Sequence, residues 1–444
     1  MASLTHAESI NPAQQPKRSM TAALRSPNFR LYFGGQLVSI SGTWIQNIAQ
    51  GYLVFLLTKS ELWLGIVACA AGLPVLLMAP FGGVIVDRVP RRTILICTQT
   101  AQMILAFILA AITFSGVVQV WHVVVLAFLL GVTNTLDTPA RQMIIVEMVG
   151  RDELESGIAM NSIMNNVGRI LGPAVAGLAL VQFGTAWCFL LNGLSFVAVL
   201  AGLFLMKVPH AIKTINDVPP LRQLREGVEY SVKEPLILAL LLITAISGLL
   251  SFPITQIMPA FADVILHSPD TGYAAINAGV GVGCVIAGAI FGWSIYKFGK
   301  IRLVVGGMLI SALAMTLLAT LNDIFLASFM CGIYGVFMLL QFMSINTTLQ
   351  MITPDAFRGR VMSLYSLGLL GFTPFGALAM GAIATAFGTA FSVALYGILT
   401  AVLGIVVVIR WPIMLTRDIE TPLFTSIEEE ALIEQIVPSP VVSD

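Results

Sequence analysis

Long apolar stretches recur along the whole of this 444-residue chain and set the strongest limit on what it can fold into. Each is about 20 residues long, enough for a helix to cross the roughly 30 Å of hydrocarbon in a lipid bilayer. Hydrophobic residues make up 57% of the chain and charged residues only 10%, whereas about 25% of a soluble domain is charged. Most of the chain is therefore expected to lie in lipid.

The stretches are solidly apolar, which indicates helices rather than the alternating strands of a membrane barrel. A backbone in lipid must satisfy its hydrogen bonds internally, and a helix does so within one segment. We expect an all-α membrane protein with twelve transmembrane helices, although Pro253 interrupts the seventh. The spans are predicted at 31–57, 62–86, 93–113, 120–138, 158–182, 186–206, 236–258, 273–296, 303–320, 324–348, 361–387 and 390–411.

The distribution of cations predicts how the spans are oriented. With an inside N-terminus, Lys59 alone falls in an outside loop and Arg169 alone within a span, which leaves 21 of the 23 Lys and Arg residues for the inside. This is a very strong positive-inside bias. We therefore expect a multi-pass protein of the cytoplasmic (inner) membrane with both termini in the cytoplasm.

The longest internal polar stretch, Pro209–Pro235, separates six spans from six. Within it, four apolar residues at i, i+3, i+7 and i+11 predict a short amphipathic helix at the membrane surface, with a plain linker as the alternative. These are Leu221, Leu224, Val228 and Val232. The expected organisation is an N-terminal tail (1–30), a six-helix bundle (31–208), a central cytoplasmic loop (209–235), a second six-helix bundle (236–411) and a C-terminal tail (412–444).

A charged decapeptide between the second and third spans is repeated in the second half. It reads Gly83-Val84-Ile85-Val86-Asp87-Arg88-Val89-Pro90-Arg91-Arg92, and its faded copy reads Gly292-Trp293-Ser294-Ile295-Tyr296-Lys297-Phe298-Gly299-Lys300-Ile301. The motif resembles the cytoplasmic loop signature of major facilitator superfamily transporters, G-x-x-x-D-[RK]-x-G-[RK]-[RK], with Pro90 in the position of the second glycine. The resemblance implies the major facilitator fold of two pseudo-symmetric six-helix halves.

Asp87 and Arg88 are the candidate gating pair in this loop. A carboxylate at the end of a span can accept from the N-terminus of a facing helix or pair with an arginine. The resemblance implies that the loop stabilises the outward-facing state against span eleven. Gly83, Arg91 and Arg92 belong to the same candidate gate, although plain positive-inside anchoring also explains the arginines. The copy has Tyr296 where the acid would be, so the gate is expected on one side only.

The segment from Asn134 to Arg141 resembles the drug- and siderophore-exporter branch of the superfamily, as does Arg358-Gly359-Arg360-Val361. Asp137 and Arg141 are one helical turn apart, so a mutual salt bridge is one interpretation. The other joins Asp137 to Arg88 in a charge relay beside Asp87. Asp137, Arg141 and Arg358 complete the candidate gating set.

Arg169 is the one charge expected deep within a span, where a charge costs about 2.5–3.5 kcal/mol on insertion scales. Asn161, Asn165 and Arg169 repeat every four residues and share a helix face. They are candidates for substrate binding or coupling, with structural pairing as an equal alternative for Arg169. The helix-bending residues that follow resemble the fifth-helix motif of antiporter-type facilitators; they are Gly172, Pro173 and Gly177.

Polar residues also form stripes on spans one, seven and ten, which line the cavity in this superfamily. In lipid such side chains need protein or water partners, so the stripes should face inward. Helix–helix hydrogen bonds explain about half of them equally well. The candidates for substrate contact are Gln36, Thr43, Asn47, Gln50, Ser247, Ser251, Gln341 and Ser344.

Neither a cofactor nor a metal is expected. The five cysteines fall inside apolar runs without CxxC or His partners at ligand spacing, so free structural thiols are the expectation. No HExxH, GxSxG or P-loop motif supports an enzyme or an ATP-driven pump. The expected partners are a small-molecule substrate and the bilayer, with no nucleic acid, and the protein is expected to be a monomer.

The function that the sequence favours is secondary active export of small amphipathic molecules by alternating access. Proton coupling is implied by the resemblance alone, because no Asp or Glu lies near the middle of a span. An importer of the same fold, a lysophospholipid- or lipid-handling facilitator and a signalling membrane protein remain alternatives.

Overall fold

The computed structural model describes residues 22–150, 153–206 and 220–412, and every regular element in these ranges is helical. The first half begins with a short 3₁₀ turn, η2, and continues through five helices. These are η2 (Ala22–Arg25), α1 (Pro27–Thr58), α2 (Glu61–Arg88), α3 (Arg91–Phe114), α4 (Val120–Val149) and α5 (Leu154–Leu205). Helix α5 changes direction at Gly184, whose φ of 76° only glycine adopts readily, so it crosses the bundle twice.

The second half contains six crossings, two of which are interrupted by a π-helical turn. The elements are α6 (Pro220–Lys233), α7 (Pro235–Ile246), η3 (Ser247–Ser251), α8 (Ile254–Val264), α9 (Thr271–Phe298), α10 (Lys300–Leu318), α11 (Ile324–Ile352), α12 (Asp355–Ser366), η4 (Leu367–Gly371), α13 (Thr373–Phe387) and α14 (Thr389–Arg410). The π turn η3 ends two residues before Pro253, where the sequence predicts a broken span. Some side chains of α2, α5, α6 and α12 lie outside the described set.

Ten helices in the described ranges are long and apolar enough to cross a membrane. Helix α1 and the first arm of α5 make up the twelve crossings. Helix α1 is less apolar than the ten and buries polar side chains inside the bundle, among them Gln36, Ser39 and Gln46. The predicted all-α fold of two six-helix halves is therefore confirmed.

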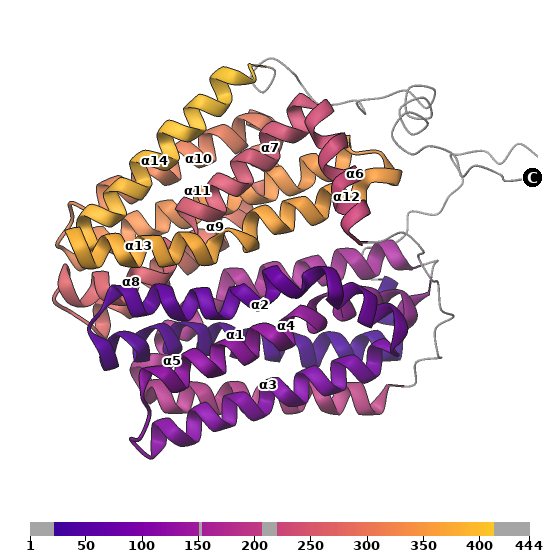
Figure 1. Ribbon diagram of the computed structural model, residues 1–444, viewed down its shortest axis with the longest axis horizontal. Helices are drawn as coiled ribbons and strands as arrows, with labels where there is room; N and C mark the ends of the chain where they lie inside the picture. Colours follow the sequence, from indigo (N-terminus) through magenta and orange to yellow (C-terminus); the bar gives the residue numbers. More distant parts are fainter. Residues whose placement is uncertain (1–21, 151–152, 207–219, 413–444) are drawn as a thin grey trace, which may run out of the picture.

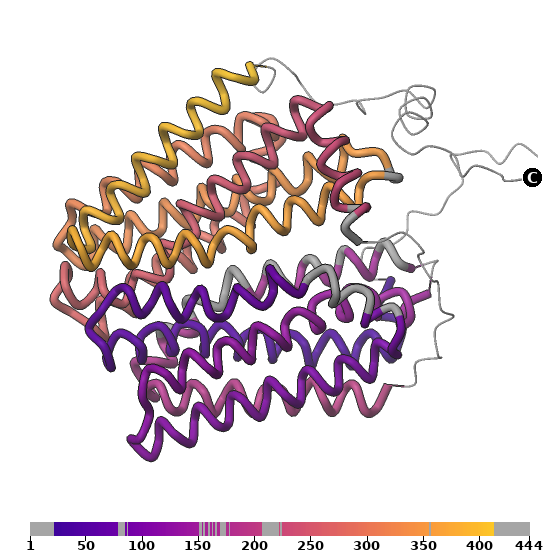
Figure 2. Tube along the Cα trace, viewed as in Figure 1, coloured from indigo at the N-terminus to yellow at the C-terminus, as the bar shows by residue number. Residues whose placement is uncertain are grey.

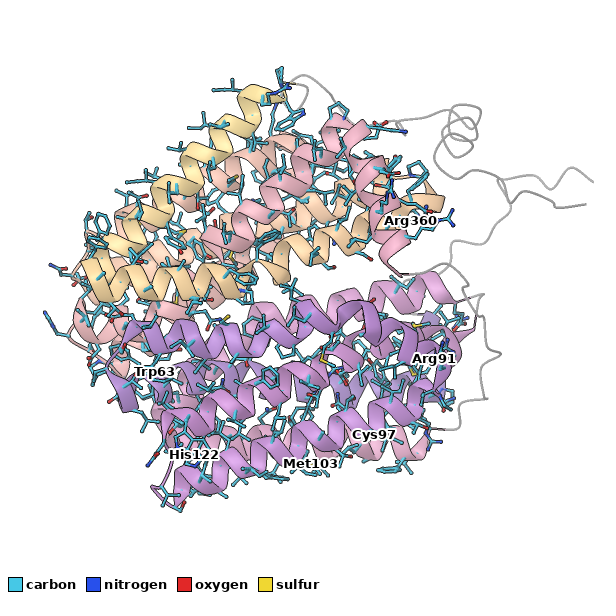
Figure 3. All side chains as sticks on the ribbon, in the orientation of Figure 1. Trp63, Arg91, Cys97, Met103, His122 and Arg360 are labelled. Carbon is cyan, nitrogen blue, oxygen red and sulfur yellow. The ribbon has the colours of Figure 1, made fainter. Side chains whose placement is uncertain are left out.

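The two halves lie side by side along the long axis of the molecule. Figure 1 shows α1–α5, in indigo to magenta, below α7–α14, in rose to yellow. The trace in Figure 2 completes one bundle before it enters the other. Figure 3 labels Arg91 and Arg360 at one end of the molecule and Trp63 and His122 at the opposite end. We call these the motif end and the far end.

The halves are joined mainly by α2 against α13 and by α5 against α9, with smaller contacts of α1 and α2 with α8. Glycines bring α2 and α13 into backbone contact. A Cβ on Gly65 would lie 2.6 Å from the carbonyl oxygen of Ala377, and one on Gly381 would collide with the carbonyl of Glu61. Helices α4 and α11, by contrast, pack closely against helices of their own half.

The predicted amphipathic helix is present as α6, which lies across the motif end of the second half (Figure 1). The ring of Tyr230 stacks on Phe357 of α12 with centroids 4.4 Å apart. Glu226 is buried and pairs with Arg222 on its own helix and with Arg360 of α12. Leu224, Val228 and Val232 are exposed on the outer side. The central helix therefore belongs structurally to the second half.

The glycine contact between α2 and α13 predicts a position-specific cost of adding a methyl group. Gly65→Ala should lower the thermal unfolding midpoint in detergent, because two backbones would have to separate and overpacking costs about 1–3 kcal/mol. Gly306→Ala is the matched control, since a Cβ there meets nothing within 4 Å. That variant should unfold at the wild-type midpoint or slightly above it. Equal midpoints for the two variants would contradict the backbone contact.

Candidate functional site

The turn that carries the opening motif is very short. Helix α2 ends at Arg88 and α3 begins at Arg91, so Val89 and Pro90 alone join them. Pro90 has a φ of −53°, and its carbonyl accepts from the backbone N–H groups of Thr93 and Ile94. Proline suits this backbone conformation, and the turn needs no glycine at this position. Arg88 is exposed, whereas the side chain of Asp87, like position 83, lies outside the described set.

The other two motif arginines bind within the first half. Arg91 Nη1 lies 2.6 Å from Glu147 Oε1, and both side chains are 11% exposed. Arg92 donates to the carbonyls of Leu203, at 2.8 Å, and Phe204, at 3.1 Å. These are among the last carbonyls of α5, which have no partner within the helix. In this conformation Arg91 ties α3 to α4, and Arg92 caps α5.

The second half satisfies its own motif-end arginines in the same way. Arg358 donates to the carbonyl of Gln350 at 3.1 Å, near the C-terminus of α11. Arg360 Nη2 lies 2.9 Å from Glu226 Oε2 of α6. The two residues are far apart in the sequence, so this ion pair was not predicted. At the motif end, every ion pair between described side chains is therefore formed within one half.

Asp137 is the centre of a buried polar cluster in the first half. Its carboxylate forms a salt bridge with Arg141, one turn along α4. It also accepts from Thr98 Oγ1, at 2.8 Å, and from Gln99 Nε2, at 2.7 Å, both on α3. The side chain lies twelve residues before the end of α4 at Val149, about 18 Å along the helix. The predicted salt bridge is present, and the relay from Asp137 to Arg88 stays a prediction.

Helix α1 adds a row of buried polar groups to this region. Tyr32, Gln36 and Ser39 are 2%, 1% and 1% exposed. Their hydroxyls and both amide atoms of Gln36 have no hydrogen-bond partner in the described part of the chain. The Tyr32 hydroxyl lies within electrostatic reach of Arg141 and Asp137. Of the three, only Gln36 was predicted, although the i, i+4, i+7 spacing places all three on one face.

Helix α5 packs against α1 along much of its length. Gly168 lies against Ile40, because a Cβ there would collide with that side chain. Asn161 is half-buried. The remaining α5 candidates have side chains outside the described set; they are Asn165, Arg169, Gly172, Pro173 and Gly177. Their roles stay predictions.

The polar stripe of the second half is buried around the π turn η3. Gln341 Nε2 donates to Ser247 Oγ at 2.8 Å, and Tyr334 donates to the carbonyl of Ser251 at 2.9 Å. Ser344 is fully buried, and its hydroxyl has no partner among the described residues. In this conformation Gln341, Ser247 and Ser251 take part in contacts between helices, the alternative that the sequence left open.

The polar residues farther along α1 differ from these in exposure. Asn47 is exposed, and Thr43 and Gln50 are half-buried. Thr43 donates to the carbonyl of Ser39 at 3.0 Å, a local bond that leaves its acceptor capacity free. Of the predicted substrate-contact residues on α1, these three are the accessible ones.

Comparison with known proteins agrees with the fold. The chain is 23% identical to the staphyloferrin A transporter of Staphylococcus aureus, over 84% of this chain and 93% of that protein. It is 24% identical to the enterobactin exporter EntS of Shigella flexneri, over 84% and 90%. It is 22% identical to macrolide efflux protein A of Streptococcus pyogenes, over 76% and 84%.

Solved structures show the same fold at lower identity. The nucleoside transporter NupG superimposes with a TM-score of 0.67 at 13% identity, over 88% of this chain and 100% of that one. A bacterial homologue of the lysosomal transporter Spinster, in an inward-facing and unoccupied conformation, gives a TM-score of 0.64 at 15% identity, over 90% and 97%.

The family model described as "Transmembrane secretion effector" matches residues 18–435, nearly the whole chain. Together with the twelve crossings in two halves, this match shows that the chain belongs to the transmembrane secretion effector family of the major facilitator superfamily and is a multi-pass membrane transporter of small molecules.

Proposed function

We propose that this protein is a secondary active exporter of small amphipathic molecules that works by alternating access and is coupled to protons. The observation that carries the proposal is that the two ends differ in their side-chain contacts between the halves. The halves meet through side chains at the far end, whereas the motif-end arginines bind within their own half. Such an arrangement suits one end state of a transporter in which the halves rock about a central contact.

The positive-inside bias supports placing the motif end in the cytoplasm. The tails, the central segment 209–235 and α6 would then be cytoplasmic, and the domain limits would follow the predicted bundles at 31–208 and 236–411. On this orientation the conformation faces inward. In the opposite state Asp87 and Arg88 would meet span eleven, with Gly83, Arg91, Arg92 and Arg358 shaping the same gate.

Export is supported by the names of two relatives, an enterobactin exporter and a macrolide efflux protein, and a staphyloferrin A transporter also matches most of this chain. We propose a substrate with an apolar body and several polar groups, contacted by Thr43, Asn47 and Gln50 of α1. We further propose that Arg169 binds an anionic group of that substrate, because an arginine in a span is costly unless it is used.

The polar cluster around Asp137 is the proposed proton site. Its carboxylate is buried, and it is shared between Arg141 and two neutral donors on α3. Protonation would cancel its charge and leave the half-buried Arg141 without its counterion, which is unfavourable. Arg141 would then move toward other acceptors, and the groups of Tyr32 and Gln36 that have no partner among the described residues lie on the neighbouring helix. Proton binding would thus be linked to a local rearrangement.

A reconstituted system tests the function directly. Proteoliposomes with the purified protein, loaded in turn with a siderophore, a macrolide and a lipophilic cation, should release at least one of them faster when a pH gradient is imposed. A protonophore should abolish the acceleration. Release that is insensitive to the gradient would contradict proton coupling. Net uptake of the substrate into the vesicles under the same gradient would establish import instead.

Asp87→Asn tests the proposed cytoplasmic gate. The variant should reach the membrane at the wild-type level, because the amide fits the same space. We expect the transport rate to fall by about tenfold or more, which corresponds to a loss of roughly 1.4 kcal/mol in the balance between states. Arg225→Gln, at an exposed position of α6, is the surface control. Wild-type transport by Asp87→Asn would refute the gate.

Asp137→Asn tests the proposed proton site separately. The amide can still accept from Thr98 through its oxygen, but it cannot be ionised. We expect proton-driven export to be lost while downhill, gradient-independent flux of the same substrate remains measurable. Proton movement, followed with a pH-sensitive dye inside the vesicles, should disappear in the variant. Unchanged proton-driven export would exclude Asp137 as the carrier, and Asp137→Glu, which keeps the acid, should retain partial activity.

A further inference from the structure

The far end of the bundle carries polar contacts that join the two halves. Lys59 Nζ, at the end of α1, lies 3.0 Å from Asp263 Oδ2 on α8. Thr389 Oγ1, at the start of α14, donates to Glu61 Oε1 of α2 at 2.9 Å. Among the ion pairs between described side chains, Lys59–Asp263 is the one that joins the halves.

Two stacked tyrosines extend this set into the interior. The Tyr52 hydroxyl of α1 donates to the carboxylate of Asp270, directly before α9. The rings of Tyr52 and Tyr273 stack with centroids 5.6 Å apart and an interplanar angle of 13°. The Tyr273 hydroxyl in turn donates to the carbonyl of Ile48 at 3.0 Å. Both rings are buried, so their stack is shielded from water, whereas Asp270 is exposed.

Lys59 is an unusual residue for its position. It is the one cation in the loops at the far end, against the strong cation bias toward the motif end. Its backbone has a φ of 47°, a left-handed conformation that is unfavourable for any residue with a Cβ atom. Its ammonium also lies over the Phe55 ring, 5.3 Å from the centroid. A residue that combines two unfavourable features is best explained by the contact its side chain makes.

The relative strength of these contacts follows from charge and burial. An exposed ion pair such as Lys59–Asp263 stabilises little by itself. A hydrogen bond from a hydroxyl to a carboxylate is stronger than a neutral one because the acceptor is charged, and here the donor Tyr52 is buried although Asp270 is exposed. We therefore expect Tyr52–Asp270 to contribute most to the stability of the closed far end. Lys59–Asp263 should mainly align the two halves.

We propose that Tyr52, Lys59 and Glu61 are positioning residues that hold the far end closed through Asp270, Asp263 and Thr389. We call these three contacts the far-end latch. The latch is formed across the halves, so it exists only while the far ends of α1 and α2 touch α8, α9 and α14. A contact made in one state alone shifts the population toward that state. The far-end latch would thus oppose the motif-end gate, and transport would require each to open in turn.

The inference rests on alternating access, but its test needs neither a substrate nor a coupling ion. Spin labels at Val117→Cys, in the α3–α4 turn, and Asn322→Cys, in the α10–α11 turn, report the separation of the halves at the far end. The five native cysteines are replaced by alanine, and the full chain is measured in lipid nanodiscs by double electron–electron resonance. We expect a dominant short distance in this background.

Tyr52→Phe is the sharpest variant, because it removes the hydroxyl and keeps the ring stack on Tyr273. It should raise the ratio of long to short distances severalfold, and Lys59→Gln should raise it less. Arg225→Gln is the matched control, since it breaks an exposed pair with Glu229 within a single helix. The control should leave the distances unchanged.

The exchange variant, Lys59→Asp with Asp263→Lys, should restore the short distance relative to Lys59→Gln. Unchanged distances in both Tyr52→Phe and Lys59→Gln would overturn the far-end latch, and a failed exchange would overturn the role of the ion pair. A shift in distance in a protein that exports none of the panel would support the latch and reject only the proposed substrate class.

Discussion

The contact between α2 and α13 is the feature on which the rest of the molecule depends. At Gly65 and Gly381 the two helices approach until backbone touches backbone. In lipid there is little hydrophobic drive to bring helices together, so association relies on close van der Waals packing, which small residues allow. Together with the packing of α5 on α9, this contact holds the halves against each other, and Lys59 meets Asp263 and Tyr52 meets Asp270 across the same seam.

The two ends use charge differently, and the difference is physical. At the motif end Arg92 and Arg358 bind helix carbonyls, and Arg91 and Arg360 bind acids of their own half. These bonds stabilise each bundle without linking it to the other. At the far end a lysine and three acids form contacts between the two halves. A molecule built in this way can change state by exchanging interfaces while each half stays intact.

Much of the fold could be predicted from the sequence, because membrane-spanning helices are recognisable as apolar stretches of about 20 residues. The predicted spans at 31–57 and 62–86 agree with Pro27–Thr58 and Glu61–Arg88, and the predicted break between 182 and 186 falls at Gly184. Local pairs were also accessible: Asp137–Arg141 and Arg222–Glu226 follow from i, i+4 spacing. Contacts between residues distant in sequence were not, because no periodicity connects Tyr52 with Asp270 or Glu226 with Arg360. Lys59 was visible as an isolated cation, yet its partner required the fold.

The buried groups of α1 suit a role in the proposed change between states. A buried polar atom without a partner costs about 1–3 kcal/mol, and Tyr32, Gln36 and Ser39 present four atoms on one helix face that have no partner in the described part of the chain. Asp137, by contrast, has three donors, so the hydrogen-bond partners are unevenly shared between α1 and the adjacent α4. A rearrangement that turned Arg141 from Asp137 toward α1 would satisfy the α1 acceptors at the expense of the carboxylate. Under the proposed proton coupling, that exchange would become favourable once the carboxylate is protonated, and the cluster would link proton binding to a movement of α1 and α4.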